Sequence, residues 1–188
     1  MYTGKERMPV DLGKEFLSCT TEKFHDVKKL AEKAMEQLTL EELNQLPSSE
    51  SNSIAVIVRH LSGNMIARWT DFLHSDGEKA ERNRDLEFEG SYPSKEELLS
   101  AWDKGWDALF AALSSLGPDD LMKTVTIRNE PHSVLKAIQR QLSHYSYHIG
   151  QIVYIGKQIR DTSWKNLSVP RGKSEQYTEQ VKNSHANR

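Results

Sequence analysis

The stretch that decides the fold is Ser133–Ile159, SVLKAIQRQLSHYSYHIGQIVYIGKQI. Its apolar residues recur every three or four positions, the spacing that places side chains on one face of an α-helix. An isolated helix cannot bury such a stripe, so the stretch predicts a long helix packed into a larger core. The stripe consists of Leu135, Ile138, Leu142, Tyr145, Ile149, Ile152, Gly156 and Ile159.

Three further segments carry the same alternation. The first extends from Leu17 to Leu38, and the second from Ile54 to about His74, after Ser53, a favoured N-cap. The third extends from Ser94 to Leu116 and stops before Gly117-Pro118. Four amphipathic helices that each need partners predict an all-α protein, an antiparallel four-helix bundle.

The connections between these helices are longer than a minimal bundle requires, and residues 75–93 and 117–132 are the largest. Long connections frequently carry function. We interpret the charged run Asp76–Glu89 as a solvated loop. The alternation of Lys123–Arg128, with turn residues after it, is compatible with a small β-hairpin near residues 123–131 at one end of the bundle.

Composition bounds the class of protein. A chain of 188 residues with 37% apolar residues can bury one sizeable core, so one domain is expected. No apolar stretch approaches 18 residues, which excludes a membrane span, and the start lacks the apolar region of a signal peptide. We therefore expect a cytoplasmic protein. Cys19, the single cysteine, permits no internal disulfide, and we expect it to be buried on its helix.

The C-terminal region differs in composition from the rest. We divide the chain into a bundle, residues 1–160, and a C-terminal extension, residues 161–188, that packs on the bundle or trails from it. Residues 157–188 carry seven Lys or Arg against three Asp or Glu, which is typical of a solvated tail. The formal net charge of the whole chain is −2, which argues against a nucleic-acid-binding protein.

His144 and His148 are four residues apart on the last predicted helix. Their side chains differ by about 40° around the axis and about 6 Å along it, so both imidazoles can reach one metal ion. The pair lies at the flank of its apolar stripe, and His60 lies in the same relation to the stripe of its own helix. Because a flank borders a cleft, we predict an open divalent-metal site on His60, His144 and His148.

A chance origin of the pair is the alternative, because His-x-x-x-His occurs in many helices that bind no metal. Tyr145 follows His144 where the zinc-protease signature has a glutamate, so proteolysis is not expected. The other histidines have no second histidine three or four residues away, and we interpret them as surface or loop residues. His132 precedes the helix that carries His144 and His148 and could approach the site. The other histidines are His25, His74, His132 and His185.

Polar neighbours of the three histidines could line the predicted cleft. Gly63 removes a side chain one turn from His60, as an accessible polar pocket would require. The alternative is that the polar neighbours face solvent or pack on the surface. The four candidates are Asn64, Gln141, Tyr147 and Gln151.

The two histidine-bearing stretches together resemble a known family. Asn52–Leu61, NSIAVIVRHL, carries one histidine early in the second helix, and His144–Gln151, HYSYHIGQ, begins 84 residues after His60. This arrangement, over about residues 11–160, resembles the DinB/YfiT-like superfamily. Ser168–Tyr177, SVPRGKSEQY, is similar to the closing stretch of an uncharacterised subgroup of that superfamily.

The resemblance implies an antiparallel four-helix bundle, frequently a homodimer, with zinc, nickel or a similar ion on the residues that match His60, His144 and His148. Members with known activity use thiols such as bacillithiol, mycothiol or glutathione in S-transfer or isomerisation. The implied function is therefore a bacillithiol-type S-transferase that joins a low-molecular-weight thiol to a small electrophile. The alternative is a metal-binding bundle without turnover, such as a sensor or a structural dimer.

Overall fold

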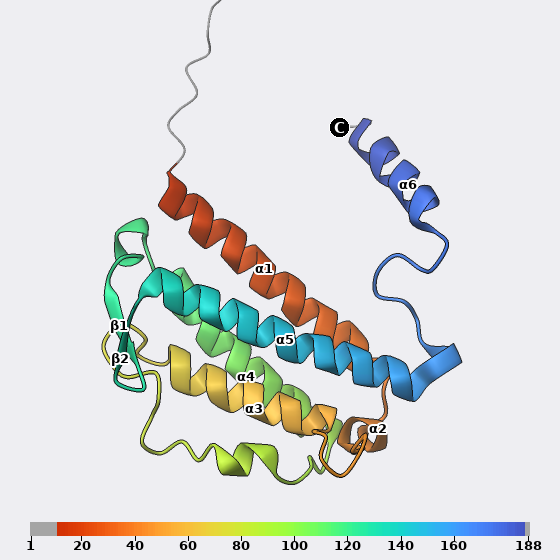
Figure 1. Ribbon diagram of the computed structural model, residues 1–188, viewed down its shortest axis with the longest axis horizontal. Coiled ribbons are helices and arrows are strands. Elements are labelled where there is room, and N and C mark those ends of the chain that lie inside the picture. The colour runs from red at the N-terminus through yellow and green to blue at the C-terminus, as the bar shows by residue number, and fades with distance from the viewer. Residues whose placement is uncertain (1–10, 187–188) are drawn as a thin grey trace, which may run out of the picture.

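The computed structural model describes residues 11–186, and four of its helices form the bundle that the apolar stripes predict (Figure 1). A small two-stranded sheet lies at one end, which confirms the hairpin. Short helical segments and a C-terminal helix complete the described part of the chain. The elements are α1 (Leu12–Met35), α2 (Leu40–Asn44), α3 (Ile54–Trp69), η1 (Asp85–Phe88), α4 (Lys95–Ser114), η2 (Pro118–Asp120), β1 (Thr124–Ile127), β2 (Glu130–Ser133), α5 (Val134–Arg160), η3 (Asp161–Ser163) and α6 (Ser174–Ala186).

Side-chain caps fix where the bundle helices begin. Ser53, Ser94 and Ser133 each accept a hydrogen bond from the backbone N–H three residues on, at the starts of α3, α4 and α5. The predicted first helix was too long at its end, because Thr39 starts the separate helix α2 with a capping box that includes Glu42. The second helix was likewise predicted too long, since α3 ends at Trp69.

The four bundle helices run as two parallel pairs. α1 packs against α5 and α3 packs against α4, and the two pairs point in opposite directions (Figure 1). Parallel neighbours cannot be joined by a short turn, because the chain must first return along the whole helix. Residues 70–94, which we call the crossover connection, make this return along α3 and include η1. The long connection predicted at residues 75–93 therefore has a topological cause.

The interior of the bundle is rich in aromatic side chains. Trp69, Trp102 and Trp106 are each at most 2% exposed. The Trp69 indole Nε1–H donates to the hydroxyl of Tyr145 at 3.0 Å, and that hydroxyl donates to the side-chain oxygen of Asn64 at 3.1 Å. The side-chain polar groups of Trp69, Tyr145 and Asn64 are therefore paired with one another inside this core.

The hairpin is tied to the start of the crossover connection. Its turn residues Arg128 and Asn129 have positive φ values of 54° and 62°, which is typical of a type I′ turn. The Asp76 carboxylate accepts hydrogen bonds from the backbone N–H groups of both, at 3.0 and 2.8 Å. The Gly77 backbone N–H donates to the carbonyl oxygen of Thr126 at 2.9 Å. These bonds join two segments that are far apart in the sequence.

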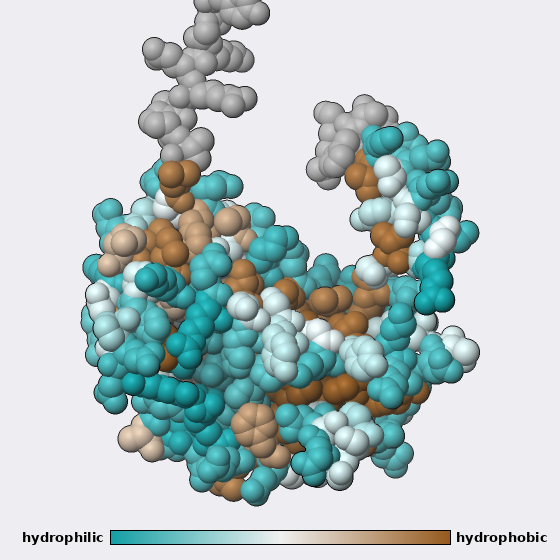
Figure 2. Space-filling model, viewed as in Figure 1, coloured by the Kyte–Doolittle hydropathy of each residue, from teal (hydrophilic) through white to brown (hydrophobic). Residues whose placement is uncertain are grey.

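The extension after α5 divides into two parts. The Gln37 side chain bonds the backbone of Lys165 in both directions, at 3.1 and 2.8 Å, and Trp164 packs beside Gly156. Beyond Val169, the side chains described up to residue 184 are exposed, and α6 projects from the bundle (Figure 2). The extension thus packs on the bundle at its start and projects from it at α6.

Two other expectations concern the surface. Cys19 was expected to be buried, and this was wrong: it is exposed, because the buried face of α1 passes through Thr20 and Phe24 instead. Among the helices described, none combines the length and apolar character needed to cross a lipid bilayer.

Candidate metal centre

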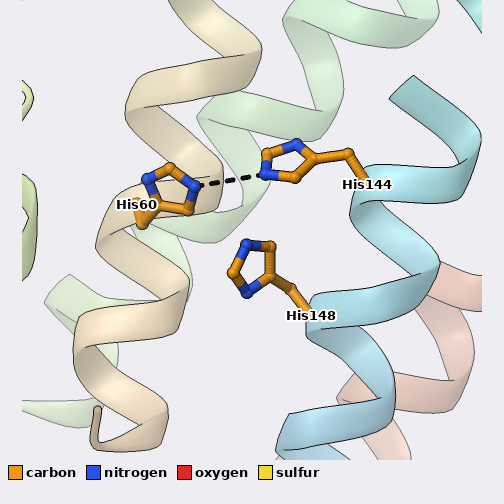
Figure 3. A group of neighbouring side chains, drawn as sticks. All are labelled: His60, His144 and His148. Carbon is orange, nitrogen blue, oxygen red and sulfur yellow. Dashed lines mark hydrogen bonds between the residues drawn. The ribbon is translucent and has the colours of Figure 1, made fainter. Parts of the chain in front are cut away.

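Three histidine rings converge between two helices of the bundle. His60 comes from α3, and His144 and His148 come from α5 (Figure 3). One ring nitrogen of each lies within 4.8 Å of the others, and His60 Nε2 is 3.3 Å from His144 Nε2. Two nitrogens bound at about 2.0–2.1 Å to one tetrahedral ion would be about 3.3–3.4 Å apart. The three residues selected from the sequence therefore form one group within metal-binding distance.

The packing of α3 against α5 brings the three rings together. α3 and α5 are antiparallel neighbours, and the spacing of four residues along α5 directs His144 and His148 at the same turn of α3. His144 and His148 are half-buried, as expected of residues beside a cleft, but His60 is only 4% exposed. The prediction that His60 borders an open cleft is thus wrong, because the crossover connection covers it.

The group that covers His60 is a carboxylate from the crossover connection. Glu87, in η1, has one side-chain oxygen 3.0 Å from His60 Nδ1, and its side chain is 8% exposed. Arg82 binds the same carboxylate through two nitrogens, Nε and Nη2, each at 2.7 Å, and its side chain is 5% exposed. The interpretation of residues 76–89 as a solvated loop was therefore wrong at Arg82 and Glu87, which form a buried ion pair.

Gly63 and Phe88 complete the contact with the crossover connection. A Cβ atom at position 63 would overlap the Glu87 carboxylate, so glycine leaves the room that Glu87 occupies. The Phe88 ring stacks on the His60 ring with 4.7 Å between centroids. Gly63 was interpreted as an opening toward solvent, whereas it accommodates a side chain from another segment. That glycine, one turn after His60, was the one sequence signal that could have indicated an incoming group.

The Nδ1 atom of His148 also has a hydrogen-bonding partner. His148 Nδ1 is 2.8 Å from the side-chain oxygen of Gln151, one turn further along α5. The Tyr147 ring lies 5.0 Å from the His148 ring and is exposed. Both Gln151 and Tyr147 line a groove of about 670 Å³ between α5 and the loop before α3. The structure thus places these two candidates at a hollow beside the histidines.

The other candidates lie elsewhere. Asn64 and Gln141 are 6% and 2% exposed, and Asn64 accepts its hydrogen bond from Tyr145 in the core. Both sit on the boundary of an apolar stripe, where a small rotation of the helix decides between core and cleft. His132 is in strand β2, outside the three-histidine group. Of the remaining histidines, His25 stacks on Phe110, His74 is exposed, and the side chain of His185 lies outside the described residues.

Burial and mutual repulsion keep the histidine pair on α5 neutral. Burial, followed by the neighbouring His148 and His60, lowers the pKa of His144 to about 3. Burial also lowers the pKa of His148, although the bond to Gln151 opposes this. For Glu87, burial acts to raise the pKa, but hydrogen bonds from His60 and Arg82 outweigh it and hold the pKa below its ordinary value. The centre thus offers two neutral imidazoles on α5 and an ionised carboxylate beside His60, an arrangement that suits metal binding.

Residues 11–173 match a family model described as a protein of unknown function, DUF1572. The chain belongs to the DUF1572 family. The DUF1572 family is a member of the DinB-like superfamily, in agreement with the resemblance based on the histidine-bearing stretches. The matched region includes the three histidines, Arg82 and Glu87, and it ends before α6. Searches among curated proteins and among solved structures gave no match.

Proposed function

We propose that this DUF1572 member binds one divalent metal ion through His60, His144 and His148 and catalyses a thiol-dependent S-transfer onto a small electrophile. The observation that carries the proposal is the convergence of three imidazoles whose spacing suits one ion. The Nδ1 atoms of His60 and His148 have hydrogen-bonding partners, Glu87 and Gln151 respectively. Partners of this kind orient the histidine ligands of metal sites.

The donor set selects the kind of ion. Three neutral nitrogen ligands suit zinc or nickel, whereas magnesium and calcium prefer oxygen ligands. Three protein ligands are also the number found in catalytic zinc sites, which leave a position for water or substrate. The chemistry that such an ion supplies is Lewis acidity, which favours the thiolate form of a thiol whose ordinary pKa is about 8.5.

A groove beside α5 supports the proposed binding of substrates. The groove of about 670 Å³ is lined by Gln151, whose side-chain oxygen is 2.8 Å from His148 Nδ1, and by Tyr147. Gly150 also lines it, and a Cβ atom at that position would have no neighbour within 4 Å. Most of the polar side chains that line it are uncharged, including Ser48, Asn52 and Gln158. In the proposed reaction the thiol sulfur forms a bond to the electrophilic carbon, the leaving group departs with its bonding electrons, and the thiol proton passes to solvent.

The class of thiol is proposed from the resemblance to the superfamily. We expect a low-molecular-weight thiol of the bacillithiol type and a homodimer, because the sequence resemblance implies them. The expected cytoplasmic location is based instead on the lack of a long apolar stretch in the sequence. Light scattering on the eluate of a size-exclusion column tests the dimer independently of the metal centre.

Metal content tests the first half of the proposal. The protein purified from cells and its His144→Ala variant are compared by elemental analysis, with His74→Ala as the control because His74 is exposed and away from the centre. We expect close to one equivalent of zinc or nickel in the wild type and in His74→Ala, and loss of most of it in His144→Ala. Equal metal content in all three proteins would refute the site.

Activity tests the second half. The metal-loaded protein is incubated with bacillithiol, glutathione or cysteine and a chromogenic electrophile, and product formation is compared with that of His144→Ala. We expect an acceleration that requires both metal and thiol. Metal binding without acceleration by any of these thiols would favour the alternative, a metal-binding bundle without turnover.

A further inference from the structure

We propose that Glu87 is a positioning residue for His60 and that Arg82 holds it in place, so that the crossover connection sets the metal affinity of the centre. This inference rests on the metal binding proposed above and assigns a role to a segment outside the four-helix core. The contact joins η1 to α3 across a gap of 27 residues in sequence.

The hydrogen bond to Glu87 determines which nitrogen of His60 is protonated. A carboxylate paired with a guanidinium is ionised and can only accept hydrogen bonds. His60 Nδ1, 3.0 Å from the Glu87 oxygen, must therefore carry the proton. In the neutral ring, Nε2, the nitrogen 3.3 Å from His144 Nε2, is then the one with a free lone pair toward the centre. A free imidazole in water prefers the opposite tautomer, with the proton on Nε2, so the carboxylate selects the form that can bind a metal.

Space and burial make the position of Glu87 specific. The Glu87 carboxylate occupies the space that a side chain at position 63 would fill. Its two oxygens each accept a hydrogen bond from one nitrogen of Arg82. The pair is buried on both sides, at 8% and 5% side-chain exposure. A buried carboxylate is costly without its cation, so Glu87 stays beside His60 only while Arg82 is present.

Further ion pairs continue from Arg82 to the hairpin. Glu78 lies 3.5 Å from Arg82 and 3.3 Å from Arg128, which is a turn residue between β1 and β2. The series Arg128, Glu78, Arg82 and Glu87 thus connects the end of the bundle with His60. Because the outer pairs are more exposed, most of the effect on the centre comes from Arg82 and Glu87.

The first test uses the metal-free protein and reads the tautomer directly. Nitrogen-15 histidine spectra are recorded for the full chain, and the His60 signals are assigned by their loss in His60→Gln. We expect the Nδ1–H tautomer of His60 in the wild type. In Glu87→Gln, which keeps an acceptor oxygen, the population of this tautomer should be lower. In Glu87→Ala the population should shift toward the Nε2–H tautomer. An unchanged Nδ1–H tautomer in Glu87→Ala would overturn the assignment.

The second test measures zinc affinity with a competing chelator. We expect Kd to rise about 10- to 100-fold in Glu87→Ala and in Arg82→Ala, and less in Glu87→Gln. Glu81→Ala, which removes an exposed carboxylate of the same connection, is the control and should leave Kd within about twofold. Circular dichroism of each variant shows whether it is folded, and Glu87→Gln supplies the comparison if Glu87→Ala is not.

The outcomes separate this inference from the proposed function. Zinc binding that is equally tight in Glu87→Ala, Glu87→Gln and the wild type would reject the role of Glu87 but leave the metal centre intact. A wild type that binds no zinc would reject the proposed function, and the claim about affinity with it. In that case the tautomer measurement still decides whether Glu87 orients His60.

Discussion

Gly105 on α4 lies directly against the backbone of Ser62 on α3, so closely that a Cβ atom at position 105 would be 2.9 Å from the Ser62 Cα. The Ser62 hydroxyl donates to the carbonyl oxygen of Ala101, one turn earlier on α4, at 2.6 Å. Two parallel helices thus approach each other where one of them has no side chain. Because His60 precedes Ser62 by two residues, this contact also fixes the depth of His60 in the bundle.

Gly105→Ala should destabilise the protein. An added methyl group must push α3 and α4 apart at a cost of about 1–3 kcal/mol, which outweighs the gain of up to about 1 kcal/mol from better helix propensity. We expect a net loss of about 1–2 kcal/mol in urea unfolding. Gly150→Ala on α5 is the matched control, because no other atom lies within 4 Å of that position, and it should be stabilising. A Gly105→Ala protein as stable as Gly150→Ala would contradict the close approach.

Tyr145→Phe should cost stability although it retains the ring. Loss of the hydroxyl leaves the Trp69 indole N–H and the Asn64 side-chain oxygen unpaired in the core. Such groups cost about 1–3 kcal/mol, which urea unfolding can measure. The control is Tyr154→Phe on the same helix, where the hydroxyl is on an exposed side chain and the change should stay within about 0.5 kcal/mol. Equal stability of the two variants would show that the buried hydroxyl contributes nothing.

Asp76 should make stability depend on acidic pH. Burial acts to raise its pKa, but bonds from the backbone N–H groups of Asn129, Glu78 and Arg128 outweigh it, so the pKa lies below its ordinary value in the folded protein. The stabilisation is therefore fully present above the unfolded pKa of about 3.9 and is lost as pH falls through the folded pKa. In urea unfolding from pH 7 to pH 3, Asp76→Asn should be less stable at neutral pH, and its difference from the wild type should shrink below about pH 4. A constant difference over this range would exclude the carboxylate charge as the cause.

Zinc should raise the melting temperature only when the three histidines are present. At a free zinc concentration of 100 times Kd, binding adds about 2.7 kcal/mol, which corresponds to an increase of about 5–10 °C for a domain of this size. Chelation should reverse the increase. We expect no increase for His148→Ala and the full increase for His74→Ala, measured by differential scanning calorimetry. An increase in His148→Ala as large as in the wild type would place the zinc elsewhere.

The fold could be predicted because its main signal is local. An apolar residue at every third or fourth position marks the buried face of a helix whatever it packs against, and Leu61, Met65 and Ile149 are buried as their spacing indicates. The pairing of parallel helices could not be predicted in the same way. This pairing depends on which apolar faces pack against each other. The long connection before α4 was the only feature of the sequence that indicated it.

The three histidines were predictable for a related reason. His144 and His148 share a helix, so their separation follows from helix geometry alone. His60 was added because it lies at the flank of its own apolar stripe, and the family resemblance supported the choice. Glu87 was missed because it is one of several carboxylates in a charged run, and the run is typical of an exposed loop. What distinguishes it from Glu81 or Glu89 is its contact with His60 and Gly63, which lie outside the run on α3 and which no pattern within the run shows.

The crossover connection also affects the order in which the centre can assemble. The loop closed by the contact between His60 and Glu87 spans 27 residues, and the loop closed by His60 and His144 spans 84. Loop-closure entropy grows with the logarithm of length, so the shorter loop costs about 1 kcal/mol less to close. We therefore expect α3 and its connection to hold an oriented imidazole first, and α5 to dock afterwards on a half-site that is already formed.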